Sequence, residues 1–116
     1  AVVVHLGTND FAAGDPGGPF LQAYVDFVRD VHTRYANARI YCAVSPMLSG
    51  TKRTMLTDYL NQVIAMRAAA GDHSLALITF APPDANTGWG CGHPNAATHV
   101  IMANLLTRTL KTDLGW

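Results

Sequence analysis

Val2-Val3-Val4-His5-Leu6-Gly7-Thr8-Asn9-Asp10 is the stretch that decides the fold class of this chain. Residues 2–6 are nearly all apolar and begin with three β-branched valines, as expected for a strand that is covered on both faces. Residues 7–10 are turn formers. A buried strand that runs into a polar turn is typical of parallel α/β sheets, in which sites form at the carboxyl ends of the strands.

The same pattern recurs along the chain and alternates with helical patterns. Further strands are predicted at residues 39–44 and 74–81, and helices from Pro19 to about residue 37, from about 54 to 70 and from about 96 to 112. The last helix is expected to face inward with Val100, Ile101, Leu105, Leu106 and Leu110. This order predicts an α/β fold with a parallel sheet and helical crossovers.

Three strands make a thin sheet, because sheets commonly have about 4–6 strands. The first strand of such a sheet would also lack one neighbour. We therefore expect residues 1–116 to be the C-terminal portion of a single domain whose N-terminal strands lie upstream.

Composition disfavours several classes of function. The chain has 49% apolar and 14% charged residues, with eight basic residues balancing eight acidic ones. No basic stripe suggests nucleic acid or anionic lipid as a partner. The apolar runs are far shorter than the roughly 20 residues of a membrane span. No glycine-rich phosphate loop follows a strand, so nucleotide binding is disfavoured.

A second unusual stretch, Trp89-Gly90-Cys91-Gly92-His93-Pro94-Asn95, follows the last predicted strand. Residues 7–10, 45–50 and 82–95 each follow a strand, so they should meet at one edge of the sheet. His93 has the chemistry of a general base, and the Asn9 amide can donate to an oxyanion. Gly7 permits close approach of the backbone to a substrate. Together these groups suit acyl transfer.

These residues resemble two motifs of the SGNH (GDSL) hydrolases. Gly7-Thr8-Asn9-Asp10 is similar to block III, and residues 91–99, with their His-Pro-Asn sequence, are similar to block V. The resemblance extends to the carbohydrate esterases, including the family 2 acetyl esterases. It implies a three-layer α/β/α sandwich with a flavodoxin-like parallel sheet, and hydrolysis of short acyl groups such as acetyl from carbohydrate or other small esters. It also implies that His93 is the general base, that Asn9 lies in the oxyanion hole and that no cofactor is needed.

The nucleophile of that family is absent from this chain. Its Gly-Asp-Ser motif precedes block III, so we expect the serine in an upstream, N-terminal segment of the same enzyme. Ser45, Ser49 and Ser74 lie outside any strand-to-helix elbow and are poor substitutes. Because the chain alone should not hydrolyse esters, a non-catalytic carbohydrate-binding or remnant domain is the alternative.

The group that orients His93 is also open at this point. Family members often carry an aspartate two or three residues before this histidine, where the present chain has Cys91 and Gly90. A backbone carbonyl orients the imidazole in some relatives, and Asp84 is the other candidate. Trp89 can either stack on a sugar or pack beneath its own loop.

The chain also contains two cysteines and several residues of types that can bind metal. We expect Cys42 and Cys91 to form a disulfide that ties the loop to the sheet, typically contributing about 2–4 kcal/mol. Such a bond implies an oxidising, extracellular location. Asp84, Cys91, His93 and His99 match no common zinc spacing, so we expect no metal.

Overall fold

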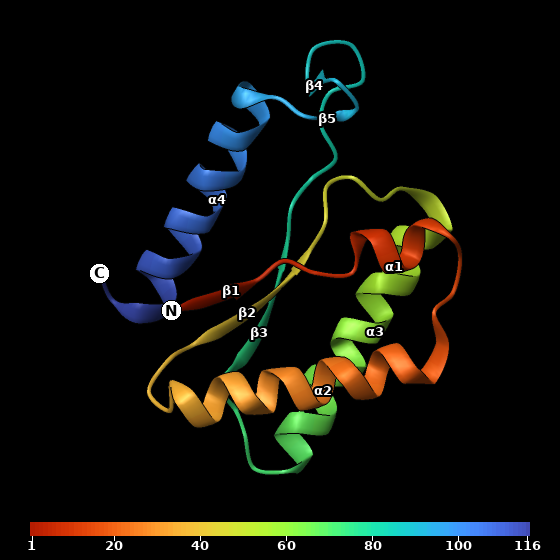
Figure 1. The fold of residues 1–116 in the computed structure, drawn as a ribbon. Helices are drawn as coiled ribbons and strands as arrows, with labels where there is room; N and C mark the ends of the chain where they lie inside the picture. Colours follow the sequence, from red (N-terminus) through yellow and green to blue (C-terminus); the bar gives the residue numbers. More distant parts are fainter.

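A parallel three-stranded sheet in the order β1-β2-β3 forms the centre of the computed structural model, which describes residues 1–116. The elements, labelled in Figure 1, are β1 (Val2–Val4), α1 (Thr8–Ala12), α2 (Gly17–Arg34), β2 (Ile40–Val44), α3 (Gly50–Ala69), β3 (Leu75–Thr79), β4 (Trp89–Gly90), β5 (His93–Pro94) and α4 (Ala96–Leu114). In register, Val2 pairs with Ile40, and Ile40 pairs with Leu75. The predicted α/β class with a parallel sheet is confirmed.

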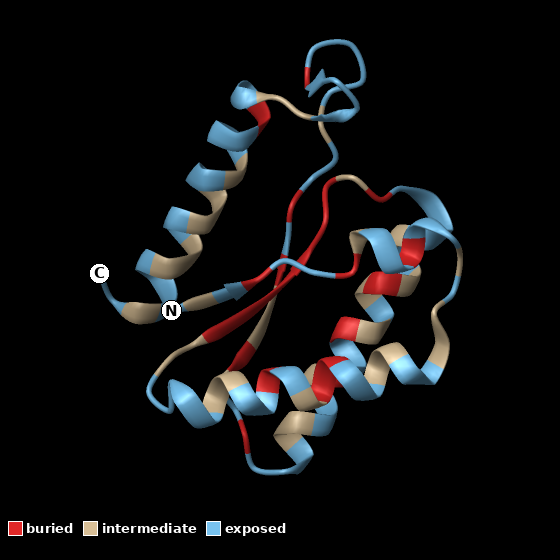
Figure 2. Cartoon of the chain, viewed as in Figure 1, coloured by how far each residue is buried: buried red, intermediate tan, exposed pale blue.

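Helices cover both faces of the sheet. Helices α2 and α3 lie on one face and α4 lies on the other (Figure 1). Strand β2 is buried along its whole length (Figure 2), because alternate residues face the two helical layers. Ile40, Cys42 and Val44 join the core under α2 and α3, whereas Tyr41 and Ala43 pack with Phe80 toward α4.

Two details differ from the sequence-based expectations. Residues 8–10 are not a simple turn but begin the short helix α1, and Gly7 occupies its N-cap position with a φ of 105°. In α4, Leu105, Leu106 and Leu110 pack on the sheet as predicted, but Val100 and Ile101 are 59% and 65% exposed. A 19-residue helix is about 28 Å long, whereas a five-residue strand spans only about 17 Å, so α4 extends past the sheet.

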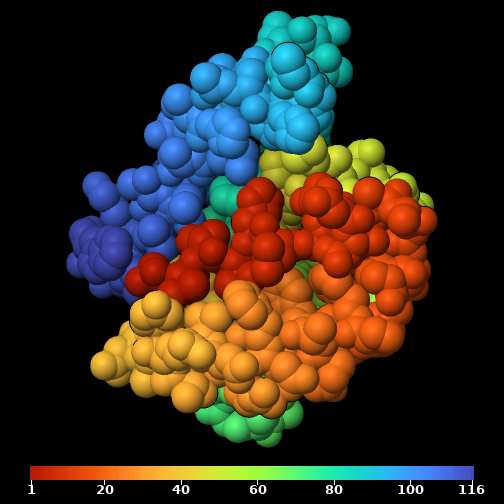
Figure 3. Space-filling view, viewed as in Figure 1, coloured from red at the N-terminus to blue at the C-terminus, as the bar shows by residue number.

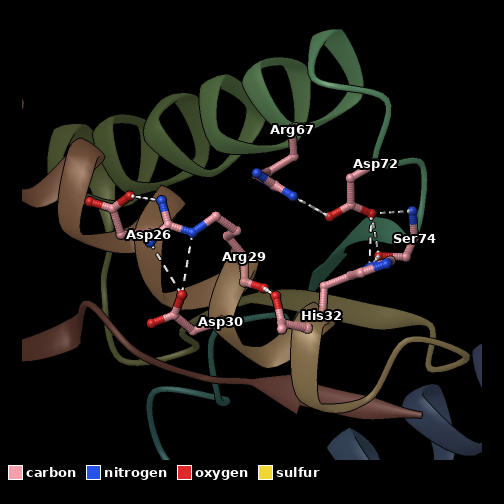
Figure 4. A network of polar contacts seen from close by, with 8 residues as sticks. Asp26, Arg29, Asp30, His32, Arg67, Asp72 and Ser74 are labelled. Carbon is pink, nitrogen blue, oxygen red and sulfur yellow. Dashed lines mark hydrogen bonds and ion pairs between the residues drawn. The ribbon is translucent and has the colours of Figure 1, made fainter.

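A buried ion pair joins three elements at the amino end of the sheet (Figure 4). Asp72 accepts a hydrogen bond from Arg67 Nη2 at 3.1 Å, and its Oδ1 lies 3.1 Å from His32 Nδ1. The backbone N–H and hydroxyl of Ser74 also donate to Asp72. Burial opposes ionisation of Asp72, but these hydrogen bonds and the charge of His32 hold its pKa below the usual value. The network ties α2, α3 and the start of β3 together.

No helix combines the length and the apolar character that crossing a membrane would require.

Candidate active site

A cavity of about 580 Å³ lies at the carboxyl end of the sheet. It is lined by His5–Asp10 after β1, by side chains of α2, by Met47 after β2 and by His93. In Figure 3 the loop that carries His93, in cyan, lies above the yellow-green segment that follows β2 and the red N-terminal segment. The structure therefore brings Gly7, Asn9 and His93 to one cavity from distant parts of the sequence.

Gly7 is required by both backbone and space. Its φ of 105° lies in the region that favours glycine. A Cβ at this position would lie 2.8 Å from Leu56 Cδ1 and 3.3 Å from Phe20 Cζ. The Gly7 carbonyl accepts a hydrogen bond from Phe11 N at 3.1 Å and so starts α1. Gly7 thus lets α1 begin directly at the end of β1.

Helix α1 holds Asn9 at the cavity. Its single fully buried residue is Phe11, whose ring centroid lies 5.0 Å from that of Phe20 and 5.5 Å from that of Tyr59. This aromatic cluster stabilises α1, because a five-residue helix would not be stable in isolation. The exposed Asn9 side chain lies on the opposite side of α1 and lines the cavity.

His93 is carried by a tight antiparallel hairpin. Gly90 pairs with His93, and Trp89 pairs with Pro94. Between them, Cys91 and Gly92 have φ values of 51° and 76°. Positive φ at both central residues is typical of a type I′ turn. The turn brings the Cys91 carbonyl oxygen to 3.2 Å from His93 Nδ1.

Asp84 serves the loop and not the imidazole. Its Oδ1 accepts hydrogen bonds from the backbone N–H groups of Asn86 and Thr87 and from the Thr87 hydroxyl, at 2.8–2.9 Å. The Thr87 hydroxyl and these N–H groups lower the pKa of Asp84. Asp84 lines a smaller cavity between the end of β3 and α4, away from His93. The contact of His93 Nδ1 is with a backbone carbonyl.

The expected disulfide between Cys42 and Cys91 is absent, and both thiols are free. Cys42 faces the core beneath α2, beside Tyr24, whereas Cys91 is exposed at the tip of the hairpin. Cys42 points to the α2 face of β2, and the loop after β3 leads to α4 on the other face. Burial raises the pKa of the Cys42 thiol to about 12.

The four side chains considered as metal ligands, Asp84, Cys91, His93 and His99, form no cluster of three or more such groups. Trp89 is 37% exposed and does not line the larger cavity.

Several cavity residues were missed by the sequence analysis. His5, which lies in the apolar stretch predicted as the first strand, lines the cavity with its ring 5.6 Å from that of Phe80. Burial and then the nearby charge of His99 lower the pKa of His5. Phe20 and Phe27 of α2 also line the cavity, although helical spacing assigns them to the core-facing stripe. No sequence signal separates these two from core residues.

Comparisons with known proteins identify a family and several relatives. Residues 1–101 match the GDSL-like Lipase/Acylhydrolase family. The chain is 38% identical over 117 residues to Cellulase/esterase CelE of Acetivibrio thermocellus, covering 99% of this chain and 14% of that protein. It is 26% identical to an acetylxylan esterase / glucomannan deacetylase of Cellvibrio japonicus, covering 99% of this chain and 31% of that protein.

A solved structure is similar over nearly the whole chain. The family two carbohydrate esterase from Clostridium thermocellum, solved in complex with cellohexaose, superposes with a TM-score of 0.91 at 38% identity. The match covers 99% of this chain and 36% of that one. The chain therefore spans about a third or less of the length of the relatives it matches.

Proposed function

Because the chain belongs to the GDSL-like lipase/acylhydrolase family, we propose that it is the C-terminal portion of a carbohydrate esterase domain that removes short acyl groups, such as acetyl, from sugars. In this proposal His93 is the general base and Asn9 is an oxyanion-hole residue. The observation that carries it is the shared cavity at the strand ends, lined by Gly7, Asn9 and His93. The substrate class is supported by the carbohydrate esterases among its relatives.

The nucleophile in this mechanism is a serine from a segment outside residues 1–116. His93 Nε2, which has no protein partner in this chain, removes the proton from the serine hydroxyl as the oxygen attacks the ester carbonyl. The Asn9 amide donates to the oxyanion that develops. The imidazolium then gives its proton to the departing ester oxygen of the sugar, which leaves as a free hydroxyl. A water molecule deprotonated by His93 attacks the acyl-serine next, and the acid and the serine hydroxyl are released. No cofactor takes part.

The Cys91 carbonyl replaces the usual carboxylate partner of the histidine. At 3.2 Å it can accept a hydrogen bond from Nδ1–H, which leaves Nε2 unprotonated and ready to act as a base. A carbonyl fixes the tautomer but stabilises the imidazolium less than a carboxylate does, because it carries no full charge. The proposed site is therefore a Ser-His dyad with a backbone orienting group.

The serine segment would dock along β1. This strand lies at the edge of the sheet, where Val3 and Leu6 are 37% and 51% exposed. An edge strand offers a row of free backbone groups to an incoming strand. A strand added here would end beside the cavity that His93 lines. The N-terminal segment of the same enzyme is thus its proposed partner.

Two further parts of the proposal concern the substrate side. Trp89 is exposed on the hairpin that carries His93, and its indole can pack against the apolar face of a sugar ring. An extracellular location would follow from a polysaccharide substrate, which is too large to enter a cell.

Hydrolysis of 4-nitrophenyl acetate by the intact enzyme tests the proposal. His93→Ala should abolish activity, and Asn9→Ala should lower kcat by about 10²- to 10³-fold, the usual cost of losing an oxyanion donor. The matched control is His73→Ala, because His73 is exposed at the amino end of the sheet. Normal activity in folded His93→Ala would refute the role of the base. Separately expressed residues 1–116 should gain activity only when the upstream segment is added.

A further inference from the structure

We propose that the side-chain amide of Asn95 is the positioning group that sets the place of His93 in the site. This inference rests on the proposed function, since it concerns the same histidine. Asn95 does not line the cavity, so it acts through the loop that it closes.

The His93 imidazole depends on its backbone for its position. The side chain is exposed, and its one hydrogen bond is to the Cys91 carbonyl two residues away in the same hairpin. Because the residue is exposed, burial in the core does not hold the ring in place. The hairpin of residues 89–94 therefore carries the ring as a unit, and whatever fixes the base of the hairpin fixes the ring.

Asn95 fixes that base with two different groups. Its backbone N–H donates to the Gly88 carbonyl at 3.0 Å, and its side-chain Nδ2 donates to the Thr87 carbonyl at 2.6 Å. Residues 87 and 88 enter the hairpin and residue 95 leaves it, so these bonds close the loop across its neck. The Gly88 carbonyl also accepts from the buried Thr98 hydroxyl at 2.7 Å.

The same side chain begins α4. Asn95 Oδ1 accepts a hydrogen bond from Thr98 N at 3.1 Å, the usual N-cap contact. Because Oδ1 faces a donor and Nδ2 faces an acceptor, the orientation of the amide is fixed by its partners. The neck of the hairpin is thereby attached to the first turn of a 19-residue helix.

The choice of asparagine is informative, because other residues cap helices equally well. Ser and Asp are comparable N-cap residues, but an ionised aspartate has no hydrogen to donate to the Thr87 carbonyl. Serine has one short-reaching oxygen and cannot occupy the two positions that Oδ1 and Nδ2 of Asn95 hold, one facing Thr98 N and the other facing the Thr87 carbonyl. Gly88 is equally constrained, since a Cβ there would lie 2.6 Å from Asp84 N and Pro83 Cβ. At the neck, therefore, Gly88 has no room for a side chain, and the Asn95 amide must both donate to the Thr87 carbonyl and accept from Thr98 N.

Asn95→Asp separates these two functions in the intact enzyme. Aspartate retains the N-cap acceptor but places a carboxylate oxygen against the Thr87 carbonyl, so the cap remains and the neck opens. We expect kcat for 4-nitrophenyl acetate to fall about 10- to 100-fold with little change in KM, as expected for a small misplacement of a catalytic group. The pKa on the acidic side of the kcat/KM profile should also shift, because the contact between His93 and the Cys91 carbonyl changes. The charge-matched control is Asn61→Asp, on the exposed face of α3.

Asn95→Ser is the second variant, since it keeps a cap without adding charge. It should show the same loss of kcat as Asn95→Asp, with helix content retained by circular dichroism. Unchanged kcat and pH profile in either folded variant would overturn the inference, because Asn95 would then be a cap alone. Loss of folding in both would also overturn it, since the role would be global. Full activity of His93→Ala would refute the proposed function instead, and so the two failures are distinguishable.

Discussion

Replacing Arg53 by methionine should reveal how strongly one side chain holds the ends of two strands. Arg53 lies in the first turns of α3, where Nη1 donates to the Ser45 carbonyl at 2.7 Å and Nη2 donates to the Phe80 carbonyl at 2.6 Å. Ser45 directly follows β2, and Phe80 begins the segment that leads to His93. Both residues are buried, and burial lowers the pKa of Arg53 itself.

The magnitude follows from the bonds that are lost. A hydrogen bond to a charged group contributes about 1.5–3 kcal/mol, and a buried carbonyl left without a partner costs about 1–3 kcal/mol. Methionine keeps much of the aliphatic stem, so the loss of packing is small. Because the loop can partly relax and admit water to the Phe80 carbonyl, we expect Arg53→Met to lower the free energy of unfolding by about 2–4 kcal/mol.

Urea unfolding followed by circular dichroism measures this difference. Arg29→Met is the matched control, because Arg29 also bonds two partners from a helix, the carboxylates of Asp26 and Asp30 (Figure 4). Its side chain is 49% exposed, so the control should lose only about 0–1 kcal/mol. Equal losses in the two variants, or a loss below about 1 kcal/mol for Arg53→Met, would refute the argument that burial makes the difference.

Three other predictions concern different parts of the molecule. Gly7→Ala should lower the free energy of unfolding by about 2–4 kcal/mol in the same urea titration. A φ of 105° strains alanine, and the added Cβ would collide with Leu56 of α3. A loss under about 1 kcal/mol would contradict this. The contribution of Asp72, whose folded pKa is lowered, should be fully present above the unfolded value of about 3.9 and be lost as the pH falls through the folded value. Asp72→Asn should therefore weaken the acid-side decline in the free energy of unfolding, and an unaltered pH curve would count against the network. In native protein a thiol reagent should modify Cys91 but not Cys42, and both after denaturation; equal native rates would be inconsistent with the burial of Cys42.

Strands and helices were predictable because their signals are local. The apolar runs at residues 2–6, 39–44 and 74–81 each contain an observed strand, and glycine and proline stand near the element boundaries. The edge at which the site forms was predictable too, since parallel strands place their carboxyl ends together. That is why Gly7, Asn9 and His93 could be expected at one cavity.

The features that could not be predicted from the sequence depend on the direction in which a side chain points. The free cysteines illustrate this, because the predicted disulfide required Cys42 to face the loop, whereas strand alternation turns it toward α2. Asp84 looked available as an orienting acid, but its carboxylate is occupied by N–H groups two and three residues ahead. Val100 follows the helical spacing of the inward-facing residues, yet it is 59% exposed because it lies on the part of α4 that extends past the sheet. Each case turns on three-dimensional placement rather than residue type.

The unequal covering of the two sheet faces has a consequence for local stability. Strand β2 is buried along its whole length between two helices on one side and α4 on the other, whereas α4 is mostly of intermediate or exposed burial (Figure 2). Helix α4 packs on the sheet through four partly buried side chains, Met102, Leu105, Leu106 and Leu110. Free energies of local opening follow buried apolar contact, so α4 should open before the rest of the core and its amides should exchange hydrogen faster than those of β2. Since α4 also carries the neck at Asn95, such opening would release His93 while the sheet stays folded. Heat should then abolish the proposed esterase activity before it melts the core.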